Sequence, residues 1–165
     1  MFTTQYPSPI GTLTLAANTD GLCHIVFPTG SRSMETPEHW QTDSAPFDSV
    51  ITQLDEYFAG TRREFSVKLS PKGTEFQCEV WQALSGIDYA STCSYGEIAK
   101  RIGRPSASRA VGAANGANPI PIIIPCHRVI GSTGKLTGFA GGLPTKQWLL
   151  AHEAGEQQLP GFTSP

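Results

Sequence analysis

The feature that most constrains this chain is an apolar stretch, residues 122–130, which encloses one thiol, one imidazole and one guanidinium. Its first three residues, Ile122 to Ile124, are β-branched and unbroken, which is typical of a short buried strand. Pro125 has no N–H to donate to a sheet, so it predicts the end of that strand. Cys126 is therefore expected where regular structure stops and a site can open.

A reactive Cys126 needs a group that takes its proton, because the thiolate is a far stronger nucleophile than the thiol. His127 is the nearest titratable side chain, but neighbours on an extended backbone point to opposite faces. We therefore expect a turn or a bridging water between the two, with a third group orienting the imidazole. The alternative is an inert buried thiol beside a core histidine, since unpaired cysteine is commonly buried.

Length and cysteine usage narrow the classes of protein that remain. The chain has 165 residues, which is enough for one or two small domains. Its four cysteines form no CxxC pair, so neither a zinc ribbon nor a thioredoxin-type site is indicated, and the three besides Cys126 are interpreted as buried apolar residues. No signal-peptide pattern and no membrane-spanning run is visible. We expect a reduced, soluble protein of the cytoplasm.

Charge is distributed unevenly along the chain. Residues 94–135 contain six cations and one acid, whereas the remainder contains six cations and thirteen acids. A basic stripe on an acidic body suits a surface that binds phosphate, and it repels phosphate from the other faces. A merely solvated surface explains the charge pattern equally well.

Residues 1–70 are predicted to form a small α/β unit without a visible catalytic constellation, and therefore with a structural role. Residues 12–16 alternate, and residues 22–27 form a second strand candidate. Between them, Asn18 to Gly21 supplies residues that accept positive φ in a hairpin.

The rest of this unit is predicted to contain one helix and one more strand. Apolar residues recur at helical spacing from Phe47 to Phe58, and Gly60 follows as a stop signal. Residues 64–69 alternate again, and residues 70–73 then have the composition of a linker.

Residues 74–155 are predicted to form a second, mainly helical domain. Thr74-x-x-Gln77 is a capping-box pattern, and an apolar stripe at helical spacing follows it. Trp81 lies beside this stripe, and we interpret it as a core residue and not as a stacking platform. Ser94-x-x-Glu97 is a second capping box, which opens a short helix.

A second helix is predicted after a break at Gly103, capped by Ser106 and running towards Asn115. Helix, glycine-containing turn and helix, with basic residues around the turn, is typical of a helix-turn-helix. The second helix consists mostly of small residues, which permit close approach to nucleic acid in a narrow minor groove. Arg109 is its only long side chain; packing of the alanines on a neighbouring helix remains the alternative.

The end of the chain is predicted to form a loop, a helix and a tail. The glycine-rich segment 131–142 can wall a pocket that admits a flat ligand. Residues 148–153 form an amphipathic helix, and the polar residues 156–165 read as a frayed tail. Together the patterns predict an α/β (α+β) fold, in which a small N-terminal antiparallel sheet with a helix precedes a mainly helical domain with a helix-turn-helix and Cys126.

Over residues 74–154, the ordered motifs resemble those of the O6-alkylguanine-DNA alkyltransferases, the methylated-DNA–protein cysteine methyltransferases. The first 70 residues resemble the variable N-terminal domain of that family more weakly. The motifs are Ser94-Tyr95-Gly96, Arg109-Ala110-Val111-Gly112, Asn118-Pro119, Pro125-Cys126-His127-Arg128-Val129, Gly141-Gly142-Leu143 and Trp148 to Glu153.

The resemblance implies direct reversal of DNA damage by a protein that is consumed in the reaction. Cys126 would attack the alkyl carbon on guanine O6 in one in-line displacement and keep the alkyl group. His127 would act through a water as base, and Glu153 would hold its ring. Asn118 would fix the turn beside the thiol, and Tyr95 would assist the departing guanine. No cofactor and no metal is implied.

The resemblance also implies double-stranded DNA containing O6-alkylguanine as partner, bound by a monomer through its helix-turn-helix in the minor groove. Because the damaged base lies inside a duplex, it must be flipped out, at a cost of a few kcal/mol. Arg109 would fill the vacated stack. The implied contacts to the DNA backbone are Tyr95, Gly96, Arg104 and Ser132. The implied lining of the alkyl pocket is Pro121, Leu136, Phe139, Ala140 and Gly141.

The chain departs from the family pattern at two places. Phe139-Ala140 stands where some relatives have tyrosine and serine, so we expect a loop that admits alkyl groups larger than methyl. Asn18 and Cys23 stand where some relatives bind structural zinc, so we expect none here. The sequence leaves open the activity on O4-alkylthymine, the cooperativity on DNA and any further role of the N-terminal unit.

Three other classes of protein compete with this interpretation. A DNA-lesion-binding relative that lacks transfer is disfavoured, because such relatives replace the cysteine that Cys126 represents. A helix-turn-helix regulator is disfavoured by the bare second helix, which offers few side chains to read base edges. A thiol hydrolase is disfavoured because no oxyanion-hole pattern is visible.

Overall fold

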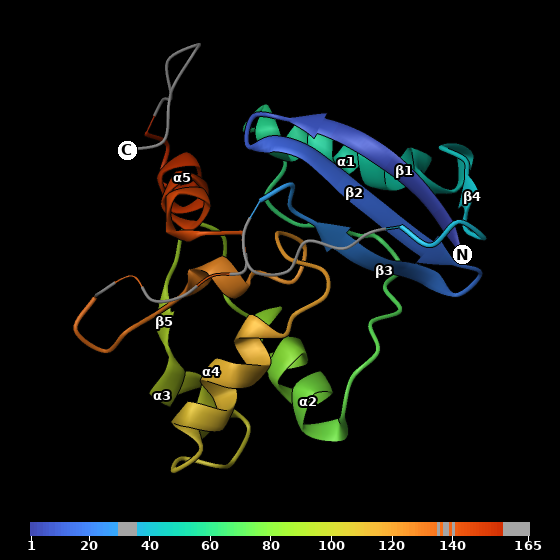
Figure 1. Cartoon of the computed structure of the whole chain (residues 1–165). Helices are drawn as coiled ribbons and strands as arrows, with labels where there is room; N and C mark the ends of the chain where they lie inside the picture. The colour runs from blue at the N-terminus through green and yellow to red at the C-terminus, as the bar shows by residue number, and fades with distance from the viewer. Residues whose placement is uncertain (30–35, 135, 137–138, 140, 157–165) are drawn as a thin grey trace.

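The computed structural model describes residues 1–29, 36–134, 136, 139 and 141–156. The sheet with its covering helix lies above a group of three helices, and a last helix lies beside the sheet (Figure 1). Ala140 and residues 157–165 of the predicted tail fall outside the described residues. No helix among the described residues is long and apolar enough to cross a membrane.

The N-terminal sheet is mixed and not purely antiparallel. Its strands are β1 (Phe2–Ser8), β2 (Gly11–Asn18), β3 (Gly21–Val26) and β4 (Gln41–Thr42), in the order β3-β2-β1-β4. β1 and β3 each pair antiparallel with β2, as expected, but β4 pairs parallel with β1. The predicted turn is confirmed: Asn18 Oδ1 accepts hydrogen bonds from the N–H groups of Asp20 and Gly21, at 2.8 and 3.1 Å.

The strand predicted at residues 64–69 is wrong except at its end. Only Leu69 forms a bridge, parallel to Leu22. Upstream, the buried Gln53 side chain accepts a hydrogen bond from the Ser66 N–H at 2.9 Å and donates one to the Ser66 hydroxyl at 3.1 Å. A side chain of the neighbouring helix therefore takes the backbone group that a strand partner would have satisfied.

The helix predicted from Phe47 is confirmed as a 3₁₀ turn, Ala45–Phe47, followed by α1 (Asp48–Phe58). Gly60 follows α1 with a φ of +81°, where glycine carries no steric penalty, as expected of a stop signal. α1 buries Val50, Leu54 and Tyr57, and Phe47 is fully buried just before it.

The helical part contains α2 (Glu75–Leu84), α3 (Tyr95–Arg101) and α4 (Ser108–Gly116). Both capping boxes, at Thr74 and Ser94, are confirmed. The cap predicted at Ser106 is wrong. α4 begins at Ser108 after a turn in which the Ala107 N–H bonds to the Arg104 carbonyl at 2.9 Å, and no side chain caps it.

The interpretation of Trp81 as a core residue is confirmed. It is 3% exposed, and its indole N–H donates to the carbonyl of Ala114 on α4 at 2.9 Å. α4 has two faces of different exposure. Val111 and Ala114 pack inwards, while Ala110 and Ala113 stay exposed on the surface. Cys78, interpreted as buried, is exposed on α2.

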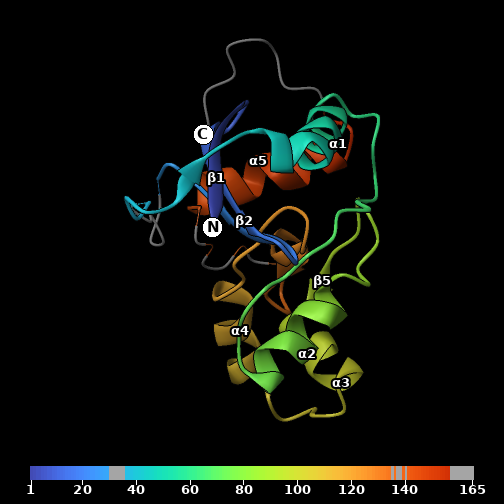
Figure 2. The same ribbon diagram turned by 90° about the vertical axis from the view of Figure 1, so that its right-hand side faces the viewer.

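α5 (Leu143–Glu153) returns the chain to the N-terminal body and lies beside α1 (Figure 2). The centroid of the Trp148 ring lies 5.8 Å from that of Phe58 of α1, and the ring stacks on His152 with a centroid distance of 4.9 Å. The His152 ring nitrogen also bonds to the Tyr57 carbonyl at 2.7 Å. α5 is therefore joined to α1 both by contacts between rings and by a hydrogen bond.

We expect Gly73→Ala to destabilise the fold. A Cβ there would lie 2.7 Å from Cζ3 of the Trp81 ring, which its own hydrogen bond to α4 holds in place. The clash should lower the free energy of unfolding by about 1–3 kcal/mol in urea denaturation.

Gly116→Ala is the matched control, because a Cβ at this end of α4 meets nothing within 4 Å and the backbone needs no positive φ. It should leave the free energy of unfolding unchanged or raise it. Equal losses in both variants would contradict the explanation.

Candidate active site around Cys126

The approach to Cys126 is a tight turn and not the predicted strand. Ile122 has a φ of +75°, a rare conformation for a β-branched residue, and it is 1% exposed. Asn118 closes the turn, because its Nδ2 donates to the Ile124 carbonyl at 2.8 Å and its Oδ1 accepts from the Ile120 N–H at 3.0 Å. The apolar run was correctly expected to be buried, but a side-chain clamp bends it.

Cys126 opens a 3₁₀ turn, Cys126–Arg128, which leads into β6 (Val129–Ile130). β6 pairs parallel with β5 (Cys93–Ser94), which directly precedes α3. The turn expected between the thiol and the imidazole is confirmed. Cys126 forms no disulfide with a described cysteine and is 4% exposed, so its sulfur can be reached only within the protein.

Behind the thiol, Glu153 forms a buried network with its two neighbours on the 3₁₀ turn. Glu153 Oε2 lies 2.7 Å from His127 Nε2. Arg128 donates to both carboxylate oxygens, from Nε to Oε1 at 2.8 Å and from Nη2 to Oε2 at 3.0 Å. The side chains of His127 and Glu153 are both fully buried. The structure thus brings Glu153 to His127, which directly follows Cys126 in the sequence.

The charges of this network follow from burial and hydrogen bonding. Burial acts to raise the pKa of Glu153, but hydrogen bonds from His127 and Arg128 hold it well below the ordinary value. Burial lowers the pKa of His127 and outweighs the opposing effect of Glu153. At neutral pH the pair is therefore a carboxylate and a neutral imidazole.

The carboxylate also fixes the tautomer of His127. An ionised Glu153 can only accept, so His127 Nε2 must carry the hydrogen and Nδ1 must be the bare acceptor. Nδ1 is buried and has no hydrogen-bond partner among the described residues. A neutral imidazole with one open acceptor nitrogen is the form that a general base requires.

Asn115 supplies the other unpartnered buried atom beside the thiol. Its Nδ2 donates to the Cys126 carbonyl at 3.4 Å, and its Oδ1 is, with His127 Nδ1, a buried side-chain atom without a partner in the described part of the chain. Buried polar atoms are rarely left unpaired, so both are available to a water or a reactant.

Lys146 is a buried cation that acts on the thiol. It is 0% exposed, and its Nζ donates to the Val129 carbonyl at 2.6 Å. Burial lowers the pKa of Lys146, while interaction with Cys126 opposes that shift. By the same interaction, a charged Lys146 favours the thiolate of Cys126.

The predicted DNA-binding positions lie at the start and turn of the helix-turn-helix, at the start of α4 and just after β6. Tyr95 and Gly96 begin α3, and Arg109 is exposed as the second residue of α4. Ser132 is exposed in the turn that follows β6. Arg104, also exposed, lies 3.7 Å from Glu79 and over the Phe76 ring, so in this structure it packs on α2.

The predicted pocket residues lie on two segments that approach β3. Pro121 is buried in the turn before Cys126, and Leu136 is half-buried. Phe139 contacts the ring of Phe27, just beyond β3, at 5.5 Å. Gly141 lies so close to that ring that a Cβ would come within 2.7 Å of it. Phe27 therefore closes the glycine-rich loop onto the N-terminal body.

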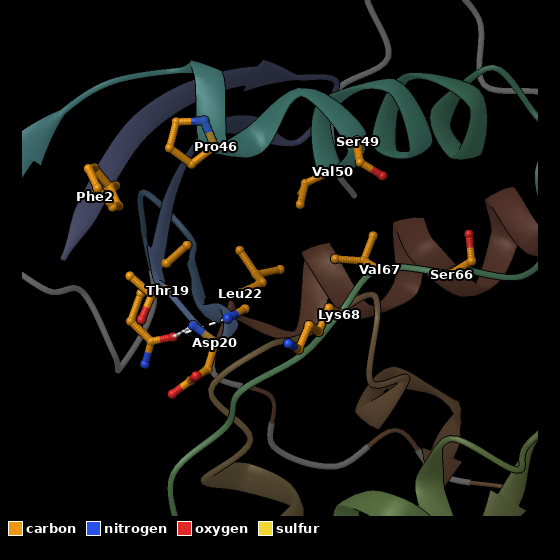
Figure 3. Close-up of a pocket in the computed structure, with 13 residues that line it drawn as sticks. Phe2, Thr19, Asp20, Leu22, Pro46, Ser49, Val50, Ser66, Val67 and Lys68 are labelled. Atoms are coloured by element: carbon orange, nitrogen blue, oxygen red, sulfur yellow. Dashed lines mark hydrogen bonds between the residues drawn. The ribbon is translucent and has the colours of Figure 1, made fainter.

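Two cavities lie away from the thiol. One of about 470 Å³ lies between the β2–β3 turn, the start of α1 and residues 66–68 (Figure 3). The other, of about 550 Å³, lies behind the Cys126 turn, where Tyr89 has Arg63 and Arg128 over its ring at 5.2 and 5.6 Å. The unpartnered buried atoms of the described chain lie in neither lining.

The positions considered for zinc have other partners. Asn18 holds the β2–β3 turn, and the Cys23 thiol lies 3.6 Å from the Gly21 carbonyl. Among the described residues, no group of three or more histidine, cysteine or acidic side chains is placed to hold a metal ion.

Sequence reasoning missed Tyr57, Asn115 and Lys146. Tyr57 and Lys146 lie in helices whose pattern of apolar residues gives no sign of the polar atoms at the ends of these two side chains. Their hydrogen-bond partners are also far away in the sequence. One feature of the sequence could have pointed to Lys146. It is a charged residue in the turn of helix just before the apolar residues 148–150. Arg128 was visible in the opening stretch, but its pairing with Glu153 was not.

Two family models match the chain. The model for the 6-O-methylguanine DNA methyltransferase, ribonuclease-like domain matches residues 1–71. The model for the 6-O-methylguanine DNA methyltransferase, DNA binding domain matches residues 75–155. Together the two matches extend over most of the chain.

Whole proteins are similar over nearly their full length. The methylated-DNA–protein-cysteine methyltransferase of Methanosarcina acetivorans is 52% identical over 153 residues, 93% of this chain and 98% of its own. That of Mycobacterium bovis is 51% identical over 151 residues, 88% of each chain. The crystal structure of Mycobacterium tuberculosis OGT in complex with DNA has a TM-score of 0.88 and 47% identity, and covers 94% of both chains.

We expect Glu153→Gln to destabilise the fold by about 3–5 kcal/mol at neutral pH, because Arg128 is left with a buried charge that lacks its partner. Because the folded pKa of Glu153 is depressed, its contribution is complete above the unfolded value of about 4.3 and is lost as the pH falls towards the folded value. Urea denaturation across this range should show a weaker pH dependence in the variant. Equal stability of both proteins at neutral pH would contradict the assignment.

Proposed function

The chain belongs to the 6-O-methylguanine DNA methyltransferase family, and we propose from this premise that Cys126 is the residue that accepts the alkyl group. The observation that carries the proposal is the buried thiol beside a neutral His127 whose Nδ1 is an open acceptor. The activity is that of a methylated-DNA–protein-cysteine methyltransferase, which repairs O6-methylguanine in DNA.

The reaction transfers one alkyl group and consumes the protein. The proton of Cys126 passes through a water to His127 Nδ1, while Glu153 and Lys146 stabilise the resulting charges. The thiolate forms a bond to the alkyl carbon as the bond from that carbon to guanine O6 breaks. The electron pair of the broken bond stays on the guanine, which takes a proton from Tyr95. The thioether has no leaving group poised for water, so Cys126 is not regenerated.

The damaged base reaches Cys126 by leaving the DNA stack. We assign α3 and α4 as the helix-turn-helix that binds DNA in the minor groove, where the exposed Ala110 and Ala113 permit close approach. Arg109 projects from the same helix to fill the vacated position. The phosphate contacts assigned to this surface are Tyr95, Gly96, Arg104 and Ser132.

The alkyl group is received between the Cys126 turn and the glycine-rich loop. We assign Pro121, Leu136, Phe139 and Gly141 to this lining, together with Ala140. Phe139 rests on Phe27 and offers no hydroxyl, so the pocket accepts alkyl groups larger than methyl. Asn118 holds the turn that presents the thiol.

The proposed functions divide between two consecutive domains. We assign residues 1–70 as a supporting domain and residues 74–155 as the domain that binds DNA and transfers the alkyl group. We assign the protein to the cytoplasm as a monomer that needs no cofactor.

Cys126→Ala tests the acceptor directly. After incubation with DNA containing O6-methylguanine, the intact mass of the wild-type protein should rise by one methyl group, with one lesion lost per protein. The variant should gain no mass. Cys78→Ala, which removes an exposed cysteine, is the control and should gain the methyl group normally. If the wild-type protein bound the lesion but gained no mass, the proposed transfer would be wrong and the protein would only recognise the lesion.

Arg109→Ala tests base flipping. Transfer from duplex DNA should slow by about tenfold or more, since extrusion of the base costs a few kcal/mol. Transfer from the free O6-alkylguanine base should be unchanged, because no stack is opened. The control is Arg62→Ala, which removes a cation paired with Glu56 in the N-terminal domain. An equal loss of rate on both substrates would refute the role given to Arg109.

A further inference from the structure

A tyrosine of the N-terminal domain reaches the centre of the active-site network. The Tyr57 hydroxyl on α1 donates a hydrogen bond to Glu153 Oε2 at 2.7 Å, across 96 positions of sequence. The same oxygen also accepts hydrogen bonds from His127 Nε2 at 2.7 Å and from Arg128 Nη2 at 3.0 Å. Tyr57 is 0% exposed, so water does not compete for its hydroxyl.

We propose that Tyr57 is a positioning residue for alkyl transfer, which holds the Glu153 carboxylate and sets how strongly that carboxylate makes His127 basic. This inference rests on the function proposed above and assigns part of the proton relay to the domain that was expected only to support the fold.

The direction of the hydrogen bond is fixed by chemistry. Glu153 is ionised and can only accept, so the Tyr57 hydroxyl must donate. Burial, followed by the charge of Glu153, raises the pKa of Tyr57 well above the ordinary value. The hydroxyl therefore keeps its proton throughout the pH range in which the protein works.

The shared oxygen makes the three donors interdependent. Each donor draws negative charge from Oε2, so each weakens the attraction that this oxygen exerts on a proton at His127. Removal of the Tyr57 hydroxyl leaves more charge for His127 and raises its pKa. A stronger donor at position 57 has the opposite effect.

The ring of Tyr57 is held firmly enough to position its partner. Its centroid lies 5.5 Å from the ring centroid of Phe65, 5.2 Å from that of His152 and 6.3 Å from that of Tyr89. These contacts come from the segment after α1, from α5 and from the loop before β5. The hydroxyl therefore has no alternative direction without movement of all three elements.

Other charged and titratable groups also face this network, and none is changed by a substitution at position 57. Those facing His127 or Glu153 are Arg128 of the 3₁₀ turn, Lys146 of α5 and Tyr89 of the loop before β5. Lys146 also faces Cys126, and Arg63 lies over the Tyr89 ring. His152 of α5 packs on Tyr57 itself and binds its carbonyl.

The chain offers a matched control in Tyr6. It is also buried in the N-terminal domain, and its hydroxyl donates to a carboxylate on α1, Asp55 Oδ1, at 2.6 Å. Tyr6→Phe and Tyr57→Phe each delete one hydroxyl from a tyrosine–carboxylate pair, but only Tyr57 contacts Glu153. A purely structural role for Tyr57 requires the two variants to behave alike.

The experiment measures the rate constant of methyl transfer from duplex DNA across a range of pH for the wild type and both variants. Because burial keeps His127 neutral at neutral pH, the acidic fall in rate follows protonation of His127. In Tyr57→Phe this fall should move to higher pH by about half a pH unit or more. The Tyr6→Phe profile should superimpose on that of the wild type.

A fluorinated tyrosine at position 57 provides the second variant and keeps the shape of the side chain. Its more acidic hydroxyl donates more strongly, so the acidic fall should move to lower pH. Opposite shifts in the two Tyr57 variants establish the inference. Unmoved profiles in the folded variants, or an equal shift in Tyr6→Phe, overturn it.

Failure of this inference is distinguishable from failure of the proposed function. A wild-type protein that gains no methyl group at any pH removes the proposed function. A wild type that transfers normally, with Tyr57 variants that follow its profile, removes only the role of Tyr57. The pKa of His127, followed by NMR titration, gives a readout that needs no transfer and should shift in the same directions.

Discussion

The structure depends on one buried carboxylate. Glu153 accepts five hydrogen bonds, two from Arg128 and one each from His127, Tyr57 and the N–H of Ala90. A charge without partners in such a place would cost several kcal/mol, so the donors must be present for the chain to fold in this way. They come from α1, from the loop before β5 and from the 3₁₀ turn, and the carboxylate thus joins the N-terminal body to the Cys126 turn.

The same carboxylate prepares the chemistry. Because it is ionised, it orders His127 with hydrogen on Nε2 and leaves Nδ1 open. Because Arg128 neutralises much of its charge and burial disfavours the imidazolium, His127 remains neutral and ready to accept a proton. Lys146 approaches Cys126 from α5 and favours the thiolate that remains. Stability and reactivity are therefore properties of the same set of contacts.

The sequence predicted those features that are encoded locally. Both capping boxes and the turn at Asn18 lie where their spacing indicates, because each is closed by residues within four positions of one another. The cap at Ser106 failed because backbone hydrogen bonds from the preceding turn start α4 instead. The strand at Ile122 failed for a related reason, since the clamp by Asn118 has no signal in the apolar run itself.

Features that depend on distant partners were not predictable from spacing. Cys126 and His127 stood out in the apolar stretch itself, whereas Glu153 was found only through the resemblance of ordered motifs, and its distance to His127 came only with the fold. Tyr57 follows Val50 and Leu54 at helical spacing and is buried with them, so the spacing alone gives no sign that its hydroxyl has a distant partner. Only the docking of α5 against α1 turns its hydroxyl into a partner of Glu153.

In the reaction that we propose, burial of the Cys126 thiol requires the damaged base to come to the protein. Cys126 is 4% exposed and lies in a turn that packs against α2 and α5 and is bonded by Asn115 of α4, so its sulfur cannot reach a carbon that stays stacked inside a duplex. An exposed thiol would avoid base flipping, but it would sit among solvent and competing electrophiles without a neutral base beside it. In the proposed reaction Cys126 reacts only once and has no product to release. The thiol can therefore stay closed off from water and rely on base flipping for access.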